Sequence, residues 1–375
     1  MSNLVLNEIE MKGWKAEVLA KEIGMPKGTF SKIVNQAATP ELRNVLKVVR
    51  HIIPHKEKEY MEQYLPSLTT PDRIIEGIEY ASTNRMFPQF QMLLDLMENG
   101  KSRKLKLYAV SYKLLYTFQK NYHAIDHTFY RNVVSVNKDV LDDEQGMMVD
   151  IAEAYFHYKN KDYKTFCVIA QSIKEQIQNI KEGYFKESVT VRLHQMLANV
   201  NLLYKCDYDQ AVECAEILIT SSIGKTYTAY GYYVKAMAAL SSNYNEAQKN
   251  IDLAIKNYKQ ASHFDAVKTM KRKMIQIKSF WNKPIEETDD YSKVYKNLSN
   301  GAVKEQMVQL SKTAITDPCE KIYIQGVLKG DDTLLLAAMT NYVKEGNYFH
   351  SLFPKQALLN RGKSVEAVEL FYNIG

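Results

Sequence analysis

The chain has 375 residues, of which 46% are hydrophobic, and its 49 basic and 43 acidic side chains give a formal net charge of +6. This length and hydrophobic content can support a large core and, at ordinary domain sizes, two or more domains. No apolar run approaches the length of a membrane span, and the N-terminus lacks a basic-then-apolar signal pattern. We therefore expect a cytoplasmic protein without a membrane partner.

The stretch from Trp14 to Gln36 predicts two short helices joined by a tight turn. Ala20 is small enough for a second helix to cross close over it, and Gly24 permits the positive φ that a sharp turn needs. Phe30 and Ile33 then recur three apart and are expected to point inward. This is the spacing of a DNA-binding helix-turn-helix: a small residue, a glycine four positions later, and apolar residues six and nine positions after the glycine.

Hydrogen-bonding side chains fill the outward positions of the second helix, which we predict to be the recognition helix. Such side chains suit the base edges and phosphates of a major groove in double-stranded DNA. The predicted DNA-binding residues are Lys27, Thr29, Ser31, Lys32, Asn35 and Gln36. The alternative is an ordinary helix pair with a solvated polar face.

A further helix is expected after Thr39-Pro40-Glu41, where a cap, a proline and an acid follow one another. Its basic residues Arg43, Lys47 and Arg50 share one face, which could follow a phosphate backbone or simply be solvated. A last short helix covers about 56–65. The proline-bounded segment 66–71 then predicts the boundary of an N-terminal DNA-binding domain of residues 1–65.

From Asp72 onward the sequence predicts helix after helix, and one phrase returns at 155–173, 201–219, 236–255 and 358–374. In each phrase an apolar helix ends in a polar turn, and a small or apolar residue opens the next helix. These residues are Phe166, Ala211, Ala247 and Ala367. The pattern resembles the tetratricopeptide repeat, so we predict an all-α fold in which residues 66–361 form an α-solenoid. The alternative is an irregular helical bundle.

Enzyme signatures are weak in this sequence. His123 and His127 are four apart in a predicted helix, but no acid stands where a zinc protease needs one, and Pro54 interrupts the pair His51 and His55. The four cysteines lack metal-site spacing, and there is no phosphate loop, nucleophile elbow or Gly-rich dinucleotide turn. We therefore expect no catalytic residue, no metal and no cofactor.

The combination of a helix-turn-helix and a degenerate repeat array resembles the RRNPP group, the peptide-sensing regulators of Gram-positive bacteria and their phages. Within that group the chain is most similar to the arbitrium receptors of Bacillus phages, over nearly its whole length. The similarity is carried by GWKAEVLAKEIGMPKGTFSKIVN, VRLHQMLANVNLL, SSNYNEAQKN, SFWNKP and YIQGVLKGDD, and by the short helix after Arg361-Gly362.

The resemblance implies a dimeric intracellular receptor that binds phage promoter DNA and activates an anti-lysogeny transcript. An imported hexapeptide would lodge in the solenoid, change the DNA-binding competence of the dimer and favour lysogeny. A plasmid or chromosomal quorum-sensing regulator of the same architecture is the alternative within the group. A helical-repeat scaffold that binds no DNA is the alternative outside it.

Five positions correspond to peptide-contacting positions of the family. Asn199 matches an asparagine that holds the peptide backbone, although a bond to a neighbouring helix would also explain it. Leu240 and Met274 match apolar groove positions, Asn347 stands where a relative has an acid, and Phe349 follows it as an aromatic wall. Met237 and Thr226 replace an asparagine and an arginine of relatives, so the resemblance does not fix the identity of the peptide.

The C-terminal helix, within residues 362–375, is apolar on more than one side. Nothing downstream in the sequence could cover Val365, Val368 and Phe371 together. Because the end of a solenoid needs a polar cap or a partner, we predict that this helix forms a homodimer interface.

Overall fold

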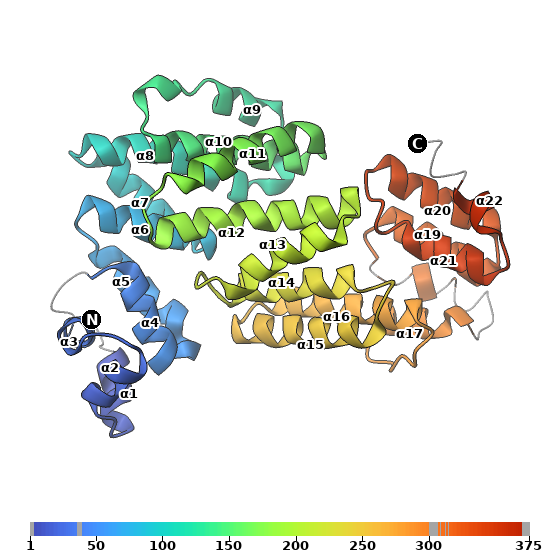
Figure 1. The fold of residues 1–375 in the computed structure, drawn as a ribbon, viewed down its shortest axis with the longest axis horizontal. Helices are drawn as coiled ribbons and strands as arrows, with labels where there is room; N and C mark the ends of the chain where they lie inside the picture. Colours follow the sequence, from blue (N-terminus) through green and yellow to red (C-terminus); the bar gives the residue numbers. More distant parts are fainter. Residues whose placement is uncertain are drawn as a thin grey trace. The chain divides into compact units, whose positions relative to one another are not determined.

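The computed structural model describes residues 4–35, 40–299, 307, 309–311, 313 and 315–369, and these residues form helices and connecting turns without strands (Figure 1). They divide into two compact units, Met1–Thr190 and Val191–Gly375. Gln36 and Phe371, two of the predicted site residues, and the predicted cap Thr39 lie outside the described residues. The all-helical fold class predicted from the sequence is confirmed.

The first unit begins with the helix-turn-helix and continues into a stack of longer helices. Successive helices pack on one another from α6 onward, with α7 between α6 and α8 and with α10 between α8 and α11 (Figure 1). Its elements are α1 (Leu4–Met11), α2 (Ala16–Glu22), α3 (Lys27–Val34), α4 (Leu42–Ile52), η1 (Pro54–Lys56), α5 (Glu57–Tyr64), η2 (Leu65–Ser67), α6 (Pro71–Thr83), α7 (Phe87–Asn99), α8 (Arg103–Lys120), η3 (Tyr122–Ala124), α9 (His127–Val134), η4 (Lys138–Val140), α10 (Asp143–Lys159) and α11 (Tyr163–Gln178).

The boundary between the units falls within α12 (Tyr184–Asn199). In the second unit α13 packs on α14, α14 on α15 and α15 on α16, and a further group pairs α19 with α20 and α20 with α21. Its elements are the π-helix η5 (Val200–Lys205), α13 (Tyr208–Thr220), α14 (Lys225–Ala238), α15 (Tyr244–Gln260), α16 (Phe264–Phe280), α17 (Asp290–Lys296), η6 (Asn297–Ser299), α19 (Pro318–Lys329), α20 (Asp332–Lys344), α21 (Leu352–Asn360) and α22 (Val365–Glu369). Pairwise packing of consecutive helices is the arrangement of an α-solenoid.

The repeated phrase of the sequence produces the same helix start three times. Asp162, Asp207 and Asn243 each cap a helix, and their side-chain oxygens accept the backbone N–H three residues later at 3.3, 3.1 and 3.1 Å. A cap of this kind satisfies one of the donors left open at a helix start. The predicted turns at these positions are therefore confirmed. The fourth phrase differs, because Ala367 is exposed whereas Phe166, Ala211 and Ala247 are fully buried.

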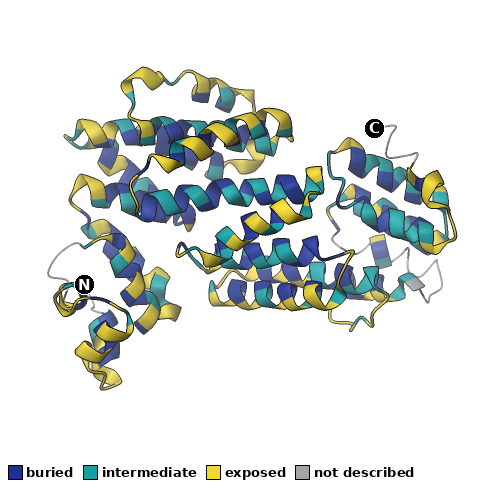
Figure 2. Cartoon of the chain, in the orientation of Figure 1, coloured by how far each residue is buried: buried dark blue, intermediate teal, exposed yellow. Residues whose placement is uncertain are grey.

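Burial follows the sides of the helices that face their neighbours within each unit (Figure 2). Small residues let these neighbours approach closely. At Gly231 in α14 an added Cβ would lie 2.7 Å from the backbone oxygen of Ala215 and 2.7 Å from a side-chain carbon of Ile219, both in α13. The absence of a side chain at this position therefore sets the spacing of the two helices. Among the described residues no helix combines the length and apolar character needed to cross a membrane.

We expect Gly231→Ala to destabilise the second unit by about 1–3 kcal/mol, because the new methyl group overlaps backbone that cannot move without displacing α13. The matched control is Gly146→Ala in α10, where an added Cβ meets nothing within 4 Å. There, alanine should be neutral or stabilising by up to about 1 kcal/mol. Urea unfolding followed by circular dichroism measures both, and equal stability of the two variants would contradict the close-packing argument.

Candidate functional site

The turn between α2 and α3 is a glycine-terminated helix end. Gly24 has φ +67°, its N–H donates to the Lys21 oxygen at 3.0 Å, and the Met25 N–H donates to the Ala20 oxygen at 2.8 Å. This pair of bonds is a Schellman motif, which satisfies the last carbonyl groups of α2 and reverses the chain. Met25 is only 8% exposed and so plugs the turn.

The residues that were expected to hold the two helices together are buried. Ala20, Phe30 and Ile33 are 2%, 1% and 3% exposed. Val18, an apolar residue of α2, is 51% exposed, so the buried side of this helix is narrow. Pro26 lies just before α3 and its oxygen accepts the Phe30 N–H at 3.0 Å, so the second helix starts one residue later than the proline.

The outward side of α3 carries the predicted DNA-binding residues. Lys27 and Lys32 are exposed, Thr29 is half-buried, and the Asn35 amide donates to the Ser31 hydroxyl at 3.1 Å. The Lys27 ammonium lies 3.4 Å from a carboxylate oxygen of Glu17, whereas Lys32 has no ion pair within the described part of the chain. The structure thus gathers four of these six residues on one short helix and a fifth, Asn35, at its C-cap.

The basic side of α4 is only partly available to a phosphate backbone. Arg43 and Lys47 are exposed. Arg50 is half-buried, and its Nε and Nη2 donate to the two carboxylate oxygens of Glu57 at 2.8 Å each. Because this bidentate pair occupies the guanidinium, Arg50 serves the packing of α4 against α5 rather than a phosphate face.

Asn199, the first of the predicted peptide-binding residues, is the half-buried last residue of α12. The π-helix η5 follows it directly and ends at Lys205, and the next residue, Cys206, has φ +51°. Because Leu203 lies in the last turn of this helix, its oxygen has no partner within the helix, and it accepts the Phe349 N–H at 3.1 Å. This bond ties the segment that follows Asn199 to the turn that carries Asn347 and Phe349. Short π-helical segments often occur at functional sites.

Asn347 belongs to a second Schellman turn, which ends α20. Gly346 has φ +67°, and the Asn347 N–H donates to the Tyr342 oxygen at 2.8 Å. The Asn347 side-chain oxygen lies 2.8 Å from His350 Nδ1, and His350 Nε2 lies 3.1 Å from the Lys273 ammonium. Because an amide oxygen only accepts, Nδ1 carries the ring proton and Nε2 accepts from Lys273.

The His350 ring is surrounded by aromatic side chains, with centroids of Phe349, Tyr342 and Phe353 at 5.3, 5.8 and 6.2 Å. Burial in these surroundings holds the pKa of His350 well below its usual range, and the neighbouring Lys273 charge lowers it further. Burial also lowers the pKa of Lys273, against the opposing effect of Glu320 and Asp317. His350 is therefore neutral at pH 7.

The apolar candidates belong to the core of the second unit. Leu240 is 0% exposed and Phe349 is 1% exposed, and both lie in one hydrophobic cluster against which the half-buried Met274 packs. The Leu240 oxygen accepts the Trp281 indole N–H at 2.6 Å, and Phe349 meets Tyr208 at 6.3 Å between ring centroids. In this conformation Leu240 and Phe349 are core residues, and contact with a peptide would require the core to open.

A buried polar cluster centred on Glu320 lies in the same unit, and its members were not brought together by the sequence alone. One carboxylate oxygen of Glu320 accepts bonds from the Tyr291 and Tyr295 hydroxyls at 2.5 and 2.7 Å and from the Gln276 amide at 3.0 Å. Lys273 lies on the same helix as Gln276. The signal available in the sequence was a glutamine between the isoleucines 275 and 277, which is an unusual place for an amide unless it is hydrogen-bonded.

The predicted dimer interface is only partly exposed. Val365 is 47% exposed, but Val368 is 2% exposed and so is covered by its own chain. An ion pair of 3.1 Å between Lys355 and the exposed Glu369 links α21 and α22. Of the described residues proposed for this interface, Val365 alone is open to a partner.

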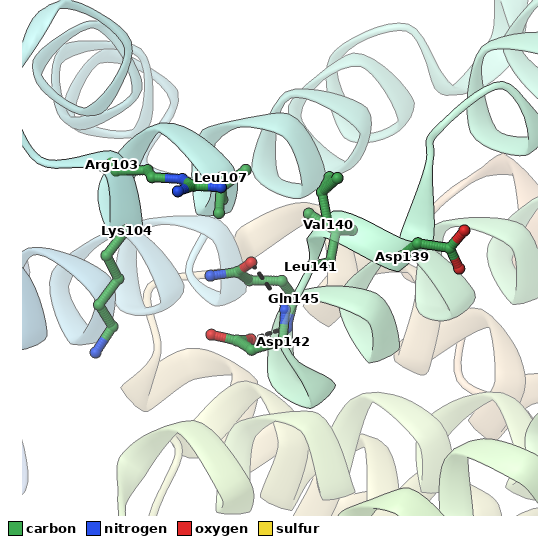
Figure 3. Close-up of a pocket in the computed structure, with 8 residues that line it drawn as sticks. All are labelled: Arg103, Lys104, Leu107, Asp139, Val140, Leu141, Asp142 and Gln145. Carbon is green, nitrogen blue, oxygen red and sulfur yellow. Dashed lines mark hydrogen bonds between the residues drawn. The ribbon is translucent and has the colours of Figure 1, made fainter.

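A hollow of about 370 Å³ lies in the first unit, beside the starts of α8 and α10 (Figure 3). Arg103 and Lys104 line one side of it, and Asp142 and Gln145 line another (Figure 3). The last two form a capping box, with the Gln145 N–H donating to Asp142 at 2.8 Å and the Asp142 N–H donating to Gln145 at 3.2 Å. Lys104 pairs with Asp72 at 2.8 Å. In this hollow, Asp142 and Gln145 thus serve a helix start, and Lys104 serves a surface ion pair.

The depressed pKa of His350 predicts an acid-sensitive second unit. Below its ordinary pKa of 6.5 the unfolded chain takes up a proton that the folded chain refuses, so stability falls as the pH drops from 7 towards 5. The change in the free energy of unfolding that this residue contributes is less than ~1.4 kcal/mol per pH unit, the value for a difference of one whole proton between the folded and unfolded chain. Urea titrations of wild type and His350→Gln at several pH values measure it. The difference in unfolding free energy between them should change with pH, and a constant difference would contradict the assignment.

Solved structures share this fold. A selenomethionine-labelled phAimR superposes with a TM-score of 0.79 at 18% identity, covering 98% of this chain and 99% of that one. A ligand-bound phAimR gives a TM-score of 0.68 at 15% identity over 86% of this chain and 98% of the other. These matches confirm the α-solenoid prediction.

Similar sequences come from Bacillus phages. The AimR transcriptional regulator of phage SPbeta is 22% identical, with 88% of this chain and 87% of that protein aligned. The AimR transcriptional regulator of phage phi3T is 20% identical, over 98% and 99%. The AimR transcriptional regulator-like family model matches residues 57–360. This is a family of transcriptional regulators and not of enzymes, as expected, and the resemblance to arbitrium receptors is confirmed. The match spans most of the chain, which therefore belongs to the AimR transcriptional regulator-like family.

Proposed function

We propose that this protein is a peptide-responsive regulator that controls the choice between lysis and lysogeny inside a bacterial host. It binds promoter DNA as a homodimer and is released or inhibited by a short imported peptide. The observation that carries the proposal is the exposed polar side of α3, which follows the Gly24 turn. The chain that carries this helix belongs to the AimR-like family. The family match covers residues 57–360, close to the proposed solenoid domain of 66–361, which supports a separate DNA-binding domain before it and a C-terminal helix after it.

The DNA-binding part of the proposal depends on the chemistry of α3. Lys32 is exposed and has no ion pair among the described residues, so its ammonium can meet a phosphate without breaking a bond. Lys27 would first have to leave Glu17, although an exposed pair of this kind is worth only about 0–1 kcal/mol. Ser31 and Asn35 hold each other in one orientation, which favours contact with a base edge.

We expect Lys32→Ala to weaken binding to a promoter fragment by about 1–3 kcal/mol and to lower the salt dependence of binding, because one phosphate contact is lost. Fluorescence anisotropy between low and physiological salt measures both quantities. The matched control is Lys164→Ala in α11, which removes the same charge from an exposed position distant in the chain. If Lys32→Ala and Lys164→Ala bind DNA alike, α3 is not the recognition helix.

The peptide-binding part of the proposal is supported by the ligand-bound phAimR structure and by the position of Asn199. A hexapeptide has few atoms, so its backbone donors and acceptors must find partners once buried. The Asn199 amide can both donate and accept, and it stands beside η5, which is hydrogen-bonded to the turn of Asn347. The Asn347 oxygen already accepts from His350, so its NH₂ group is the part that could serve a peptide.

We expect Asn199→Ala to lower peptide affinity about ten- to a hundred-fold while leaving DNA binding without peptide unchanged. The peptide is first selected from a positional-scanning library of synthetic hexapeptides by thermal shift of the wild type. Calorimetry with that peptide and a DNA titration then measure both properties. Asn347→Ala tests the second amide in the same way. Loss of DNA binding by Asn199→Ala without peptide would make Asn199 a structural residue.

A further inference from the structure

The first solenoid helix holds the beginning of α4. A carboxylate oxygen of Glu76, in α6, accepts the backbone N–H of Leu42 at 3.1 Å. Leu42 is the first residue of α4, where N–H groups have no partner within the helix, and no side chain of α4's own N-terminal turn caps it. Arg73 donates to the same oxygen at 2.7 Å and keeps the carboxylate in place. The start of α4 is thus capped from another helix.

The same side of α6 also holds the far end of α4. The Tyr80 hydroxyl donates to a carboxylate oxygen of Glu57 at 2.9 Å, and both oxygens of Glu57 accept from Arg50 in α4. Tyr80 is 2% exposed, so its hydroxyl has no alternative in water. Residues four apart in a helix lie on one side of it, which is why Glu76 and Tyr80 can reach the two ends of one neighbour.

The segment that connects α5 to α6 is packed against α6. Leu65 and Leu68 are 0% and 4% exposed, and both lie against Gly77 of α6. A Cβ at Gly77 would fall 2.3 Å from a methyl carbon of Leu68. The stretch that the sequence marks as a boundary is therefore seated on the helix that also holds α4.

α4 in turn carries the helix-turn-helix. Its buried side packs on α1 and α3, and Val45, Val48 and Val49 in it are fully buried. The position of α3 consequently depends on α4, and the position of α4 depends on α6. Tyr80 extends this chain of contacts, since its ring lies 6.2 Å from that of Tyr184, the first residue of α12.

We infer that Glu76 and Tyr80 are positioning residues for DNA binding, which fix α4, and with it the recognition helix, to the first helices of the solenoid. Neither residue lies on α3, so each acts through α4. The inference rests on the proposed DNA-binding function, but the rigid attachment itself can be measured without DNA or peptide. The two contacts together are named here the α6 clamp.

The test compares wild type with Glu76→Ala/Tyr80→Phe, a variant that removes the α6 clamp but keeps the Tyr80 ring. Nitroxide labels are attached through unnatural amino acids at the exposed residues Lys21 in α2 and Lys106 in α8, so that the free cysteines stay unlabelled. Labelled protein is diluted with unlabelled protein, and electron–electron double resonance gives the distance distribution within one chain. Wild type should show one narrow distance, and the variant a distribution about twofold broader or more.

The matched control is Glu98→Ala/Tyr116→Phe, which removes the same groups from surface contacts with Lys113 and Lys120. Helix content of both variants should equal that of wild type, so that broadening reports the joint and not unfolding. In a promoter titration the clamp variant should lose roughly three- to tenfold in affinity with an unchanged salt slope, because no phosphate contact is removed.

Each outcome decides the inference. A broad distribution in wild type, a narrow one in the clamp variant, or equal broadening in the control variant overturns it. A broad distribution with unchanged DNA affinity overturns the positioning role as well. If wild type binds no promoter DNA at all, the proposed function fails, while the distance measurement still shows whether the α6 clamp holds the helix-turn-helix.

Discussion

An all-helical chain is governed by the backbone groups at its helix ends. Each helix leaves N–H groups at its start and carbonyl groups at its finish without partners, and these must be satisfied once the end is buried. The chain does this locally in most places, with Asp162, Asp207 and Asn243 at helix starts and with Gly24 and Gly346 in Schellman turns. These local solutions make each helical pair a self-contained unit that can be stacked.

At two helix ends, the backbone group finds its hydrogen-bond partner in another part of the chain. Glu76 caps α4 from α6, and the Phe349 N–H donates to a carbonyl of the π-helix η5. At such places two parts of the chain cannot move independently without exposing a buried polar group, at a cost of about 1–3 kcal/mol. One exception holds the helix-turn-helix, and the other ties the Asn199 segment to the Asn347 turn. The proposed switch thus depends on contacts that are few and directional.

Local rules allowed much of this to be predicted. The spacing around Gly24 and the polar residues at helix starts act over a few positions, so they could be read without knowing the fold. The role of Arg50 could not, because its partner Glu57 lies on another helix and competes with any phosphate. Leu240 and Phe349 show the same limit: an apolar residue at helical spacing fits the wall of a groove and a closed core equally well, and only packing distinguishes them.

Under the proposed function, a peptide bound to the solenoid would alter DNA binding only by favouring one of two arrangements of the chain, for which it has different affinities. Typical coupling free energies between sites are about 1–3 kcal/mol, which is the size of one or two buried hydrogen bonds. Within the first unit the described contacts supply elements of that size: Tyr184, the first residue of α12, packs on Tyr80, and the Tyr80 hydroxyl donates to Glu57. A displacement of the start of α12 would therefore be transmitted to α4 through these contacts. A flexible connection before α6 would not transmit such a displacement to α4. The proposed mode of control therefore requires the packed segment between α5 and α6.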